Sequence, residues 1–489
     1  MVGIDIGTTN VKAALYSFAG VEIWVTSTSY ALQTDEAGAA IQDATDIKEG
    51  VFQVIKEMTA ECNKRKLEVS FISFSAAMHS LLAVDRNGQA LTPLFTWGDR
   101  RAEPYVEQLT DKLRTEIYHR TGTPIHPMSP FVKLLWLQAE HPEVIENAYR
   151  LVGIKTYILY QFLNEYYTDY SIANATGLFN METLTWDQKV LEYVDITKEK
   201  FPQIVPTTQL FTIRNKKTLD KLGLSSNIKI VIGASDGCLS NLGVNALSPG
   251  STALTIGTSG AIRSVVGQPL TDKKEGTFCY ALTENYWVVG GPVNNGGIVL
   301  DWARANFHVE DYTTLMQQIE MIKPGANNLF FHPYLVGERA PIWQTDVRGS
   351  FYGLTLHHQN EHLLRAVLEG INFNLYAVYQ AIMDVIGAQT KEIFVTGGFT
   401  KSPTWIQMLA DIFGLQINVT NVTENACFGA ALLGLLAIGE IKDFSTIAGM
   451  ISITEYYSPN KENYRFYQEH FKKYQKLNDY ILKMAEVVN

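Results

Sequence analysis

One short pattern occurs twice in this chain, 250 residues apart, and it restricts the fold more than any other feature. The first copy is the apolar run Val2–Ile6, then Gly7-Thr8-Thr9, then a second run from Val11 to Phe18. The second copy is Thr255-Ile256-Gly257-Thr258-Ser259-Gly260, preceded by Ala253-Leu254. β-Branched and aromatic residues on both sides of a glycine turn predict a strand, a tight turn and a strand. A repeat at this distance predicts a chain of two similar halves.

Each turn carries groups that suit a phosphate. Gly7 tolerates backbone angles that other residues avoid, so several N–H groups can lie on one concave side of the turn. Thr8 and Thr9 add hydroxyls, and Asp5 offers a carboxylate for Mg²⁺ or its waters. In the second copy Thr255 takes the place of Asp5. Two turns with one carboxylate indicate one nucleotide held between two lobes, although a single copy alone would more often be an ordinary hairpin.

Composition excludes some classes of protein. A length of 489 residues predicts two or more domains. Hydrophobic residues make up 46% of the chain and charged residues 18%, which is typical of soluble globular proteins. The net charge of −10, with no basic run, argues against a nucleic-acid partner. An anionic small substrate is still compatible with this charge, because a local cationic pocket can form in an acidic protein.

The cysteines and the apolar segments bear on the compartment. Cys62, Cys238, Cys279 and Cys427 are scattered without metal-ligand spacing, which predicts free thiols in a reducing compartment. The chain begins directly with a predicted strand, so we expect no signal peptide. The longest apolar stretch, 428–438, is too short to cross a bilayer and predicts a core helix instead. We therefore expect a cytoplasmic protein without a membrane partner.

Asp236 is the first candidate for chemistry. It follows a β-branched run at 228–233, which predicts a buried strand, and it precedes Gly237 and a small-residue helix. A carboxylate fixed in this way can act as a general base that takes a proton from a hydroxyl. It can equally cap the following helix, because Asp is common at that position. The sequence leaves both roles open.

Further polar residues follow predicted strands or lie in loops. Asp99-Arg100-Arg101 comes directly after a predicted apolar strand, a common place for site residues in α/β sheets, but the cluster could also be a local ion pair on the surface. His126 lies in a stiff loop with three prolines between residues 124 and 130. It could touch a substrate, or its ring could be satisfied by the backbone.

Two glycine-rich segments of the second half suit a nucleoside. Glycines at 290–297 precede a predicted helix at 298–307, whose start could contact an anion or a ribose. Gly397-Gly398 follows a predicted strand at 391–395, and such a pair lets a flat ring such as adenine lie against the backbone. A simple strand-to-helix turn is the alternative. Pro249-Gly250 lies in the segment 246–250, which we interpret as the boundary between the halves.

The remaining patterns predict ordinary elements. They are a third strand at 21–30, a helix at 46–64, a strand at 70–76, a loop or short hairpin at 168–180, a long helix at 361–386, a close-packing helix at 424–439 and a polar helix in the tail at 459–489.

Taken together, these residues resemble the FGGY family of carbohydrate kinases over nearly the whole length. The resemblance rests on segments in a fixed order, each weak alone: the turn from Asp5 to Lys12, Met78-His79, Lys133 with Trp136, 233–237, Gly257-Thr258, the run from 349 to 369, and Gly397-Gly398. It implies an α/β chain of two ribonuclease-H-like domains of the actin and hexokinase type. ATP, Mg²⁺ and a sugar would bind in the cleft between a domain 1–246, on the sugar and phosphate side, and a domain 247–489, on the nucleotide side.

The resemblance also implies a role for individual residues. Asp236 would be the catalytic base and Asp5 would lie near Mg²⁺. The residues implied on the phosphates are Thr8, Thr9, Asn10, Lys12, Gly257 and Thr258; those implied around the nucleoside are Gly297, Asp301, Gly397, Gly398 and Ser402; those implied at the substrate are Met78, His79, Asp99, Arg100, His126, Met128 and Asp236. The implied partner is a small sugar or sugar acid, and a homodimer is one arrangement that the sequence leaves open.

Residues at a few positions narrow the choice of substrate. The glycerol kinase branch has an Arg-Glu pair where this chain has Met78-His79 and a tyrosine where it has Met128, which argues against glycerol. The segments 75–80, 121–130 and 233–245 look most like those of bacterial gluconate kinases, which implies ATP-dependent conversion of D-gluconate to 6-phospho-D-gluconate. The candidate cations for its carboxylate are Arg100, Arg101, His79, His126 and Lys155.

Two alternatives stay open at this point. A kinase of xylulose or another pentulose belongs to the same class, and the Met-His pair occurs there too. A nucleotide-switched interaction protein of the actin or chaperone kind belongs to a different class. Such a protein needs no carboxylate base for a sugar hydroxyl and usually carries long partner-binding segments, which this sequence does not show.

Overall fold

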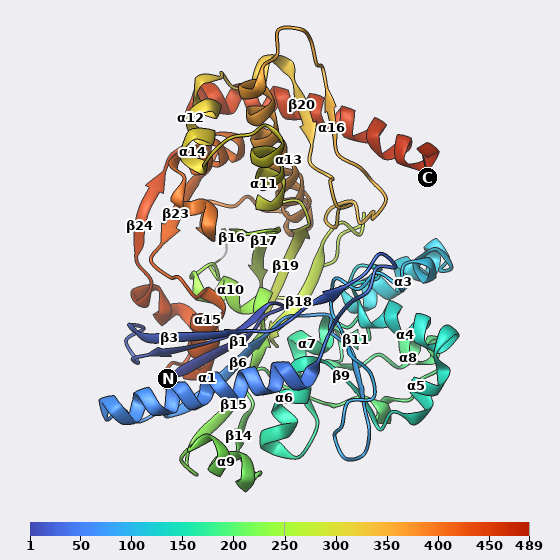
Figure 1. Cartoon of the computed structure of the whole chain (residues 1–489), viewed down its shortest axis with the longest axis vertical. Helices are drawn as coiled ribbons and strands as arrows, with labels where there is room; N and C mark the ends of the chain where they lie inside the picture. The colour runs from blue at the N-terminus through green and yellow to red at the C-terminus, as the bar shows by residue number, and fades with distance from the viewer. Residues whose placement is uncertain (249, 489) are drawn as a thin grey trace.

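The structure, a computed structural model, describes residues 1–248 and 250–488 and has two lobes, each built on one mixed β-sheet (Figure 1). Pro249 of the predicted boundary segment and Asn489 at the end of the predicted tail helix lie outside the described residues. The lower lobe of Figure 1 contains the N-terminus, and the upper lobe contains the C-terminal helix.

The sheet of the N-terminal lobe has six strands. In spatial order they are β14 (Leu210–Thr212), β15 (Lys229–Ser235), β6 (Phe71–Ala76), β1 (Val2–Ile6), β2 (Asn10–Tyr16) and β3 (Glu22–Ser29). The central strand β1 pairs antiparallel with β2, so that Asp5 lies opposite Lys12, and parallel with β6, so that Asp5 also lies opposite Ser75. β1 and β6 are almost continuously apolar because helices cover both faces of the sheet.

The sheet of the C-terminal lobe repeats this arrangement and adds one strand. In spatial order it contains β18 (Phe278–Thr283), β19 (Tyr286–Val293), β17 (Gly260–Val266), β16 (Ser251–Ile256), β22 (Glu392–Thr396), β23 (Gln416–Thr420) and β24 (Ile453–Tyr457). β16 pairs antiparallel with β17 and parallel with β22, as β1 does with β2 and β6. The prediction of two similar halves, each starting with a hairpin, is therefore confirmed.

Two equivalent helices cross between the lobes. α10 (Asp236–Gly243) follows β15, and α15 (Asn425–Ile438) follows β23. The two helices are in contact at glycines. A Cβ at Gly429 would lie 2.0 Å from the Leu239 carbonyl oxygen, and a Cβ at Gly243 would lie 2.0 Å from the Asn425 carbonyl oxygen. The predicted close packing of this alanine- and glycine-rich helix is confirmed. Although it comes late in the chain, α15 packs on the sheet of the N-terminal lobe (Figure 1).

Between β6 and β15 the N-terminal lobe carries a region of short elements, seen at the lower right of Figure 1. Its helices are α2 (Pro104–Glu107), α3 (Asp111–Thr121), α4 (Pro130–Glu140), α5 (Pro142–Asn147), α7 (Tyr170–Asn174), α8 (Gln188–Tyr193) and the 3₁₀ turn η1 (Lys198–Lys200). Its strand pairs are β7 (Leu82–Val84) with β9 (Arg150–Val152), β10 (Tyr167–Asp169) with β13 (Gln203–Val205), and β11 (Phe179–Asn180) with β12 (Thr185–Trp186). A further small sheet joins β4 (Gln33–Thr34), β5 (Ala40–Gln42) and β8 (Leu94–Phe95).

The segment 168–180, predicted as a loop or hairpin, contains the helix α7 instead. The Asp169 carboxylate caps this helix by accepting hydrogen bonds from the backbone N–H groups of Ser171 and Ile172. The glycine at 177 that suggested a loop lies after the helix has ended.

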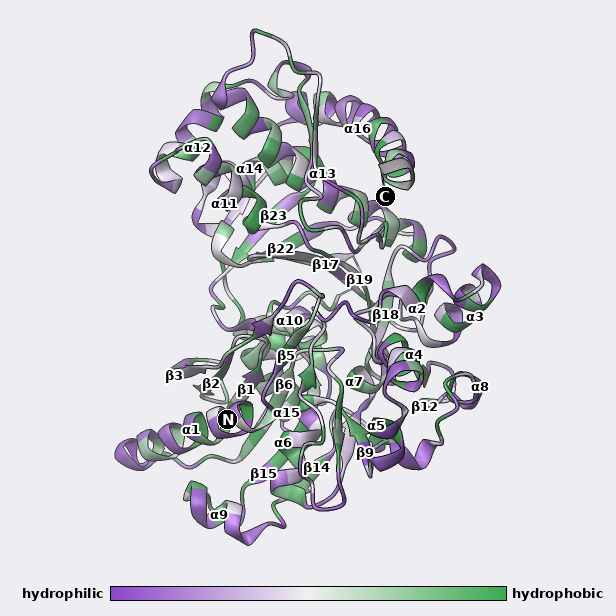
Figure 2. Cartoon of the chain, turned by 45° about the vertical axis from the view of Figure 1, so that its right-hand side comes forward, coloured by the Kyte–Doolittle hydropathy of each residue, from purple (hydrophilic) through white to green (hydrophobic). Residues whose placement is uncertain are grey.

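The remaining helices cover the sheets. They are α1 (Ala44–Arg65), α6 (Ile154–Leu163) and α9 (Lys216–Leu222) in the N-terminal lobe, and α11 (Gly297–Asn306), α12 (Tyr312–Met321), α13 (Asn360–Ile386), α14 (Pro403–Phe413) and α16 (Lys461–Val488) in the C-terminal lobe. A hairpin of β20 (Phe330–His332) and β21 (Ser350–Tyr352) and the 3₁₀ turns η2 (Ala326–Asn328), η3 (Gly398–Lys401) and η4 (Phe444–Met450) complete that lobe. Outer helices such as α9 are largely hydrophilic (Figure 2).

Two predictions concern the cysteines and the segments that could cross a membrane. Cys62, Cys238, Cys279 and Cys427 are all buried and free, as expected. Across residues 1–248 and 250–488, no helix combines the length and the apolar character needed to cross a membrane.

Candidate functional site

Contacts at the N-terminus of α15 link the first hairpin to the second sheet. The Lys12 ammonium, on β2, lies 2.7 Å from a carboxylate oxygen of Glu424, the residue before α15. The neighbouring Asn425 donates from Nδ2 to the Thr396 hydroxyl at 3.0 Å, and Thr396 lies 3.2 Å from the hydroxyl of Thr255 on β16. This chain of contacts connects the first hairpin to the second, as the interpretation of one nucleotide between two lobes requires.

Both turns are closed by their own backbone. The Gly7 N–H donates to the Asn10 carbonyl at 3.0 Å, and the Gly257 N–H donates to the Ser259 carbonyl at 2.8 Å. The Thr8 hydroxyl accepts a hydrogen bond from the Trp97 indole at 2.9 Å, whereas Thr9 is exposed at the tip.

Asp5 lies beside the first turn and is influenced by the charge of the candidate base. Its carboxylate accepts a hydrogen bond from the Ser75 hydroxyl at 2.7 Å. Burial, followed by the charge of Asp236, raises the pKa of Asp5 to about 6, and the Lys12 ammonium opposes this shift. The two carboxylates predicted for metal and for base chemistry therefore influence one another directly, within one site.

Asp236 is not the cap of α10. The N-cap is Ser235, whose hydroxyl accepts from the Cys238 N–H at 3.4 Å. Asp236 occupies the first turn, where one carboxylate oxygen accepts from the Gly237 N–H at 2.8 Å. Burial raises the pKa of Asp236, and the charge of Arg263 opposes that shift. A partly buried carboxylate that is not needed as the cap can take part in proton transfer.

A cavity of about 670 Å³ in the C-terminal lobe gathers most of the residues predicted around the nucleoside. The predicted residues in its lining are Gly257, Thr258, Gly297, Asp301, Gly398 and Ser402. A Cβ at Gly398 would meet no atom within 4 Å, so the wall is open for a flat ring there. Gly397 is absent from the lining of this cavity in the described structure. The turn requires glycine at this position, because φ is +115° and a Cβ would lie 2.2 Å from the Ile256 carbonyl oxygen.

The residues predicted at the substrate divide into two groups. His79 and Met128 lie together, because the buried Lys133 ammonium donates to the carbonyl oxygens of both. His126 joins them through Nδ1, which accepts from the Met128 N–H at 3.1 Å, and Met78 reaches towards Gly237. The His79 ring donates from Nδ1 to a backbone carbonyl at 2.7 Å, and burial lowers its pKa to about 3. Burial also lowers the pKa of His126 well below its usual value, so both histidines are neutral at pH 7.

Asp99 and Arg100 are engaged elsewhere. The buried Asp99 carboxylate lies 2.6 Å from the Arg101 guanidinium, and it accepts from the Ala40 N–H at 3.2 Å. Arg100 is half exposed, with its closest carboxylate, Glu103, 4.0 Å away. The interpretation of this cluster as a local ion pair therefore describes Asp99 and Arg101 better than a free substrate contact does.

Two other predicted cations also have partners. Lys155 lies 2.7 Å from Asp169 with both side chains almost fully buried. Lys12 would have to exchange Glu424 for a phosphate in order to reach a nucleotide. Of the five cations proposed for a substrate carboxylate, none is both charged and free beside Asp236 in the described part of the chain.

Two arginines that the sequence patterns did not single out act electrostatically on the candidate base Asp236. Arg263 lies on β17, and Arg339 follows the loop after β20. Their signal in the sequence was a lone arginine in an apolar strand and a Gly-Glu-Arg-Ala-Pro segment. Neither pattern indicates a site without the fold.

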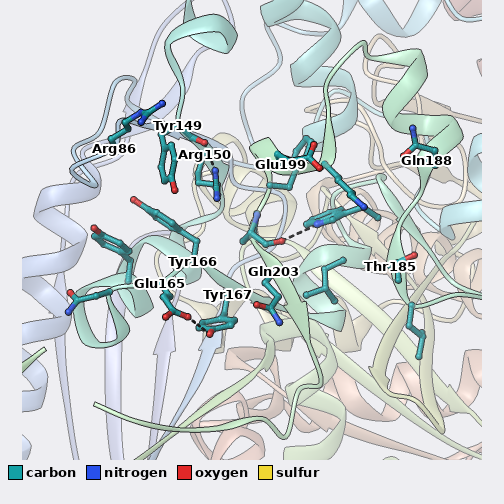
Figure 3. A pocket seen from close by; sticks show the side chains of 18 residues that line it. Arg86, Tyr149, Arg150, Glu165, Tyr166, Tyr167, Thr185, Gln188, Glu199 and Gln203 are labelled. Atoms are coloured by element: carbon teal, nitrogen blue, oxygen red, sulfur yellow. Dashed lines mark hydrogen bonds between the residues drawn. The ribbon is translucent and has the colours of Figure 1, made fainter. Parts of the chain in front are cut away.

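A separate hollow of about 850 Å³ lies on the N-terminal lobe and contains none of the predicted site residues among those that line it (Figure 3). Tyr160 and Tyr166 stack there with their ring centroids 4.3 Å apart, and the Arg150 guanidinium lies 4.1 Å from the centroid of Tyr149. These rings and cations are largely engaged with one another.

Comparison with known proteins identifies the family. The N-terminal domain of the FGGY family of carbohydrate kinases matches residues 1–243, and the C-terminal domain of the same family matches residues 252–438. The chain belongs to the FGGY family of carbohydrate kinases. This kinase is therefore ATP-dependent and transfers phosphate to a carbohydrate, and the sequence resemblance is confirmed.

The kinase is also similar to individual proteins over its full length. It is 44% identical to the gluconokinase of Bacillus licheniformis, over 96% of this chain and 93% of that protein. Two solved structures from Lactobacillus acidophilus, described as a gluconate kinase and as a ligand-bound xylulose kinase, each superpose with a TM-score of 0.95 at 37% identity, covering 100% of this chain and 99% of theirs. The predicted fold, two lobes of the actin and hexokinase type, is confirmed.

Proposed function

We propose that this kinase transfers the γ-phosphoryl group of ATP to the 6-hydroxyl of D-gluconate and produces 6-phospho-D-gluconate and ADP. The proposal is supported by the contacts that link the first hairpin to the second sheet through Glu424 and Asn425, and by the mutual influence of the Asp5 and Asp236 carboxylates. The 44% identity to a gluconokinase supports gluconate as the acceptor.

In this proposal Asp236 is the general base. Its carboxylate accepts the proton of the acceptor hydroxyl while the hydroxyl oxygen forms the new bond to the γ-phosphorus. The bond between that phosphorus and the bridging oxygen breaks, and ADP leaves with the electron pair. The raised pKa of Asp236 makes it a better proton acceptor than an exposed aspartate. Closure of two lobes would exclude water, so that the sugar accepts the phosphate.

The nucleotide would extend from the cavity to both turns. Its base would lie against the open wall at Gly398, and its ribose near Gly297 and Asp301. The backbone N–H groups and hydroxyls of Thr8, Thr9 and Thr258 would hold the phosphates, because the N–H groups of Gly7 and Gly257 already close the turns.

Asp5 fits a Mg²⁺ ion that is bound mainly by phosphates. No group of three or more acidic, histidine or cysteine side chains able to hold a metal occurs within 1–248 and 250–488. Mg²⁺ in kinases usually needs one or two carboxylates, because water and phosphate oxygens complete its octahedron. When bound, the ion would neutralise charge that develops on the phosphates. Asp5 itself would orient it, directly or through a water.

A coupled assay of ADP formation tests the proposal. Gluconate, xylulose, ribulose and glycerol are compared at equal concentration with ATP and Mg²⁺. We expect turnover with gluconate to exceed turnover with each neutral sugar. Turnover of xylulose without turnover of gluconate would favour the second candidate, a pentulose kinase, which the similarity to the solved xylulose kinase of Lactobacillus acidophilus supports. ATP hydrolysis that no polyol changes would contradict both.

A further inference from the structure

Resting on the proposed function, we propose that Arg263 and Arg339 together bind the carboxylate of the sugar acid, at the end of the acyclic substrate opposite the hydroxyl that is phosphorylated.

Arg263 presents a guanidinium to the residues beside the candidate base. It projects from β17, where its strand partner is Gly290, and a Cβ at Gly290 would lie 2.8 Å from its Cγ, so this glycine leaves room for the side chain. Its Nε and Nη2 lie 3.3 and 3.6 Å from the position that a Cβ of Gly237 would occupy. The Nε is buried and has no hydrogen-bond partner among the described residues.

Arg339 reaches the same region from the C-terminal lobe. Its side chain is 92% buried, since 8% of its surface is exposed. The guanidinium lies 4.7 Å from the centroid of the Trp97 ring and donates from Nη2 to the Val293 carbonyl at 3.3 Å. Its Nε is also buried and unpartnered within residues 1–248 and 250–488. Two buried guanidinium groups with donors that lack acceptors lower the stability of the protein, unless a bound ligand accepts those hydrogen bonds.

The charges around this pair favour an anion. Both side chains lie against the same strand, since Arg263 pairs with Gly290 and Arg339 donates to the carbonyl of Val293, both on β19. Burial, and then the positive charge of Arg263, lowers the pKa of Arg339 to about 10. Glu338, the acidic neighbour of Arg339, is already held by the side-chain amides of Asn295 at 2.9 Å and Asn374 at 2.7 Å. Asp236 is the acidic group that acts most strongly on Arg263, and it is needed as the base. A bound carboxylate would offset the two like charges, and arginine suits it because its donors match both oxygens.

The position along β17 fits an extended substrate. Arg263 lies four residues beyond Ser259 of the phosphate turn, roughly 13 Å along the strand. This backbone separation is comparable to the length of a phosphoryl group followed by an acyclic carbon chain. His126, whose Nε2 is buried and lacks a partner in the described chain, adds a group that could bind a hydroxyl along it. The inference replaces the cations predicted from sequence with two that are buried and available.

The test compares gluconate with D-glucitol, its neutral counterpart, in the full-length enzyme. Arg263→Gln and Arg339→Gln are measured beside Arg86→Gln, whose arginine lies at the hollow of Figure 3. We expect the ratio of kcat/KM for gluconate over glucitol to fall on the order of 10²-fold in the first two variants and to stay unchanged in the third. Arg263→Lys should restore part of the ratio, because it returns the charge without the paired donors.

Binding measured by calorimetry with gluconate separates a folding defect from a lost contact. A variant with the melting temperature of the wild type and no gluconate heat supports the proposal; wild-type gluconate affinity in both variants overturns it. An equal loss for gluconate and glucitol also overturns it, because it indicates a structural role. The wild type could prefer another sugar acid to gluconate, with the variants losing that preference. This result would support the arginine site and contradict gluconate as the substrate. If the wild type prefers neutral sugars, both fail.

Discussion

At the start of α10, Ser235 is the N-cap, and Asp236 lies in the first turn without capping the helix. Ser235 caps the helix and thereby leaves the Asp236 carboxylate available at the cleft. At position 79, a histidine with a φ of +66° is buried and neutral, so it adds no charge to its surroundings. At this scale, burial and the neighbouring charges determine which groups can take part in catalysis and which can bind an anion.

The first prediction separates the base from the cap. Asp236→Asn should lower kcat by about 10²–10⁴ with little change in ATP affinity, because the amide cannot accept the proton. Ser235→Ala should instead lower the free energy of unfolding by about 1 kcal/mol, because it removes the cap. Steady-state kinetics, ATP titration and denaturant unfolding of both variants provide the check. Retained turnover in Asp236→Asn would contradict the assignment of the base.

The second prediction concerns pH. Burial, and then the charge of Lys133, lower the pKa of His79 to about 3 from 6.5. The unfolded chain therefore binds a proton as the pH falls below 6.5, while the folded protein does not, and stability is lost in the window between 6.5 and about 3. At pH 5 this loss is up to about 2 kcal/mol.

His79→Asn removes the titrating ring and suits the left-handed backbone at this position. The melting temperature of this variant should fall less steeply between pH 7 and 5 than that of the wild type. Parallel curves for the two proteins would show that His79 titrates normally.

At the scale of elements, the helix pair α10 and α15 joins the lobes. Glycines let the two helices approach so closely that backbone touches backbone. The same crossing places Glu424 and Asn425 where they contact the first hairpin and the second sheet. The position of the two glycine-threonine hairpins therefore depends on helix packing that lies outside the hairpins themselves.

The third prediction tests this packing. Gly429→Ala would place a Cβ 2.0 Å from the Leu239 carbonyl oxygen, so the helices must separate. We expect a loss of about 1–3 kcal/mol in the free energy of unfolding, together with weaker ATP binding. Gly449→Ala is the matched control, because a Cβ there meets no atom within 4 Å in the described structure. Equal stability of the two variants would contradict the role of the crossing.

Elements with strong local patterns were predictable from sequence. The hairpin at Gly7 and its copy at Gly257 follow from glycine between apolar runs, and α1 and α13 follow from helical spacing. The helix α7 was not predictable, because its short polar sequence is stabilised by the Asp169 cap and by tertiary contacts.

Site residues divide in the same way. The lining of the cavity of about 670 Å³ in the C-terminal lobe was predictable where glycine follows a strand, as at Gly398. The pairing of Lys12 with Glu424 joins residues 412 positions apart, and no local pattern indicates it. Arg263 and Arg339 become visible as a pair when the fold brings β17 and the loop after β20 to the same place.

At the scale of the whole molecule, the two lobes share a core. The buried cluster around α15 contains Phe71 and Val231 of the N-terminal sheet and Tyr280 and Val288 of the C-terminal sheet. A helix from the second half of the chain thus completes the core of the first half. The lobes are joined at this core.

The fourth prediction follows from this shared core. Neither lobe keeps its apolar surface covered if the other unfolds, so thermal unfolding should be a single transition. Calorimetry without ligands checks this expectation. Two well-separated transitions would mean that the lobes are stable independently and that the α15 cluster contributes little.

The central claim is that both lobes hold one ATP while Asp236 removes the proton of a sugar-acid hydroxyl. Phosphorus NMR of the enzyme with ATP, Mg²⁺ and gluconate tests it most directly. The account predicts that the γ-phosphate signal is replaced by one phosphomonoester signal coupled to the two protons of a CH₂ group, as 6-phosphogluconate requires. Inorganic phosphate as the sole product, at a rate that gluconate does not change, would contradict it.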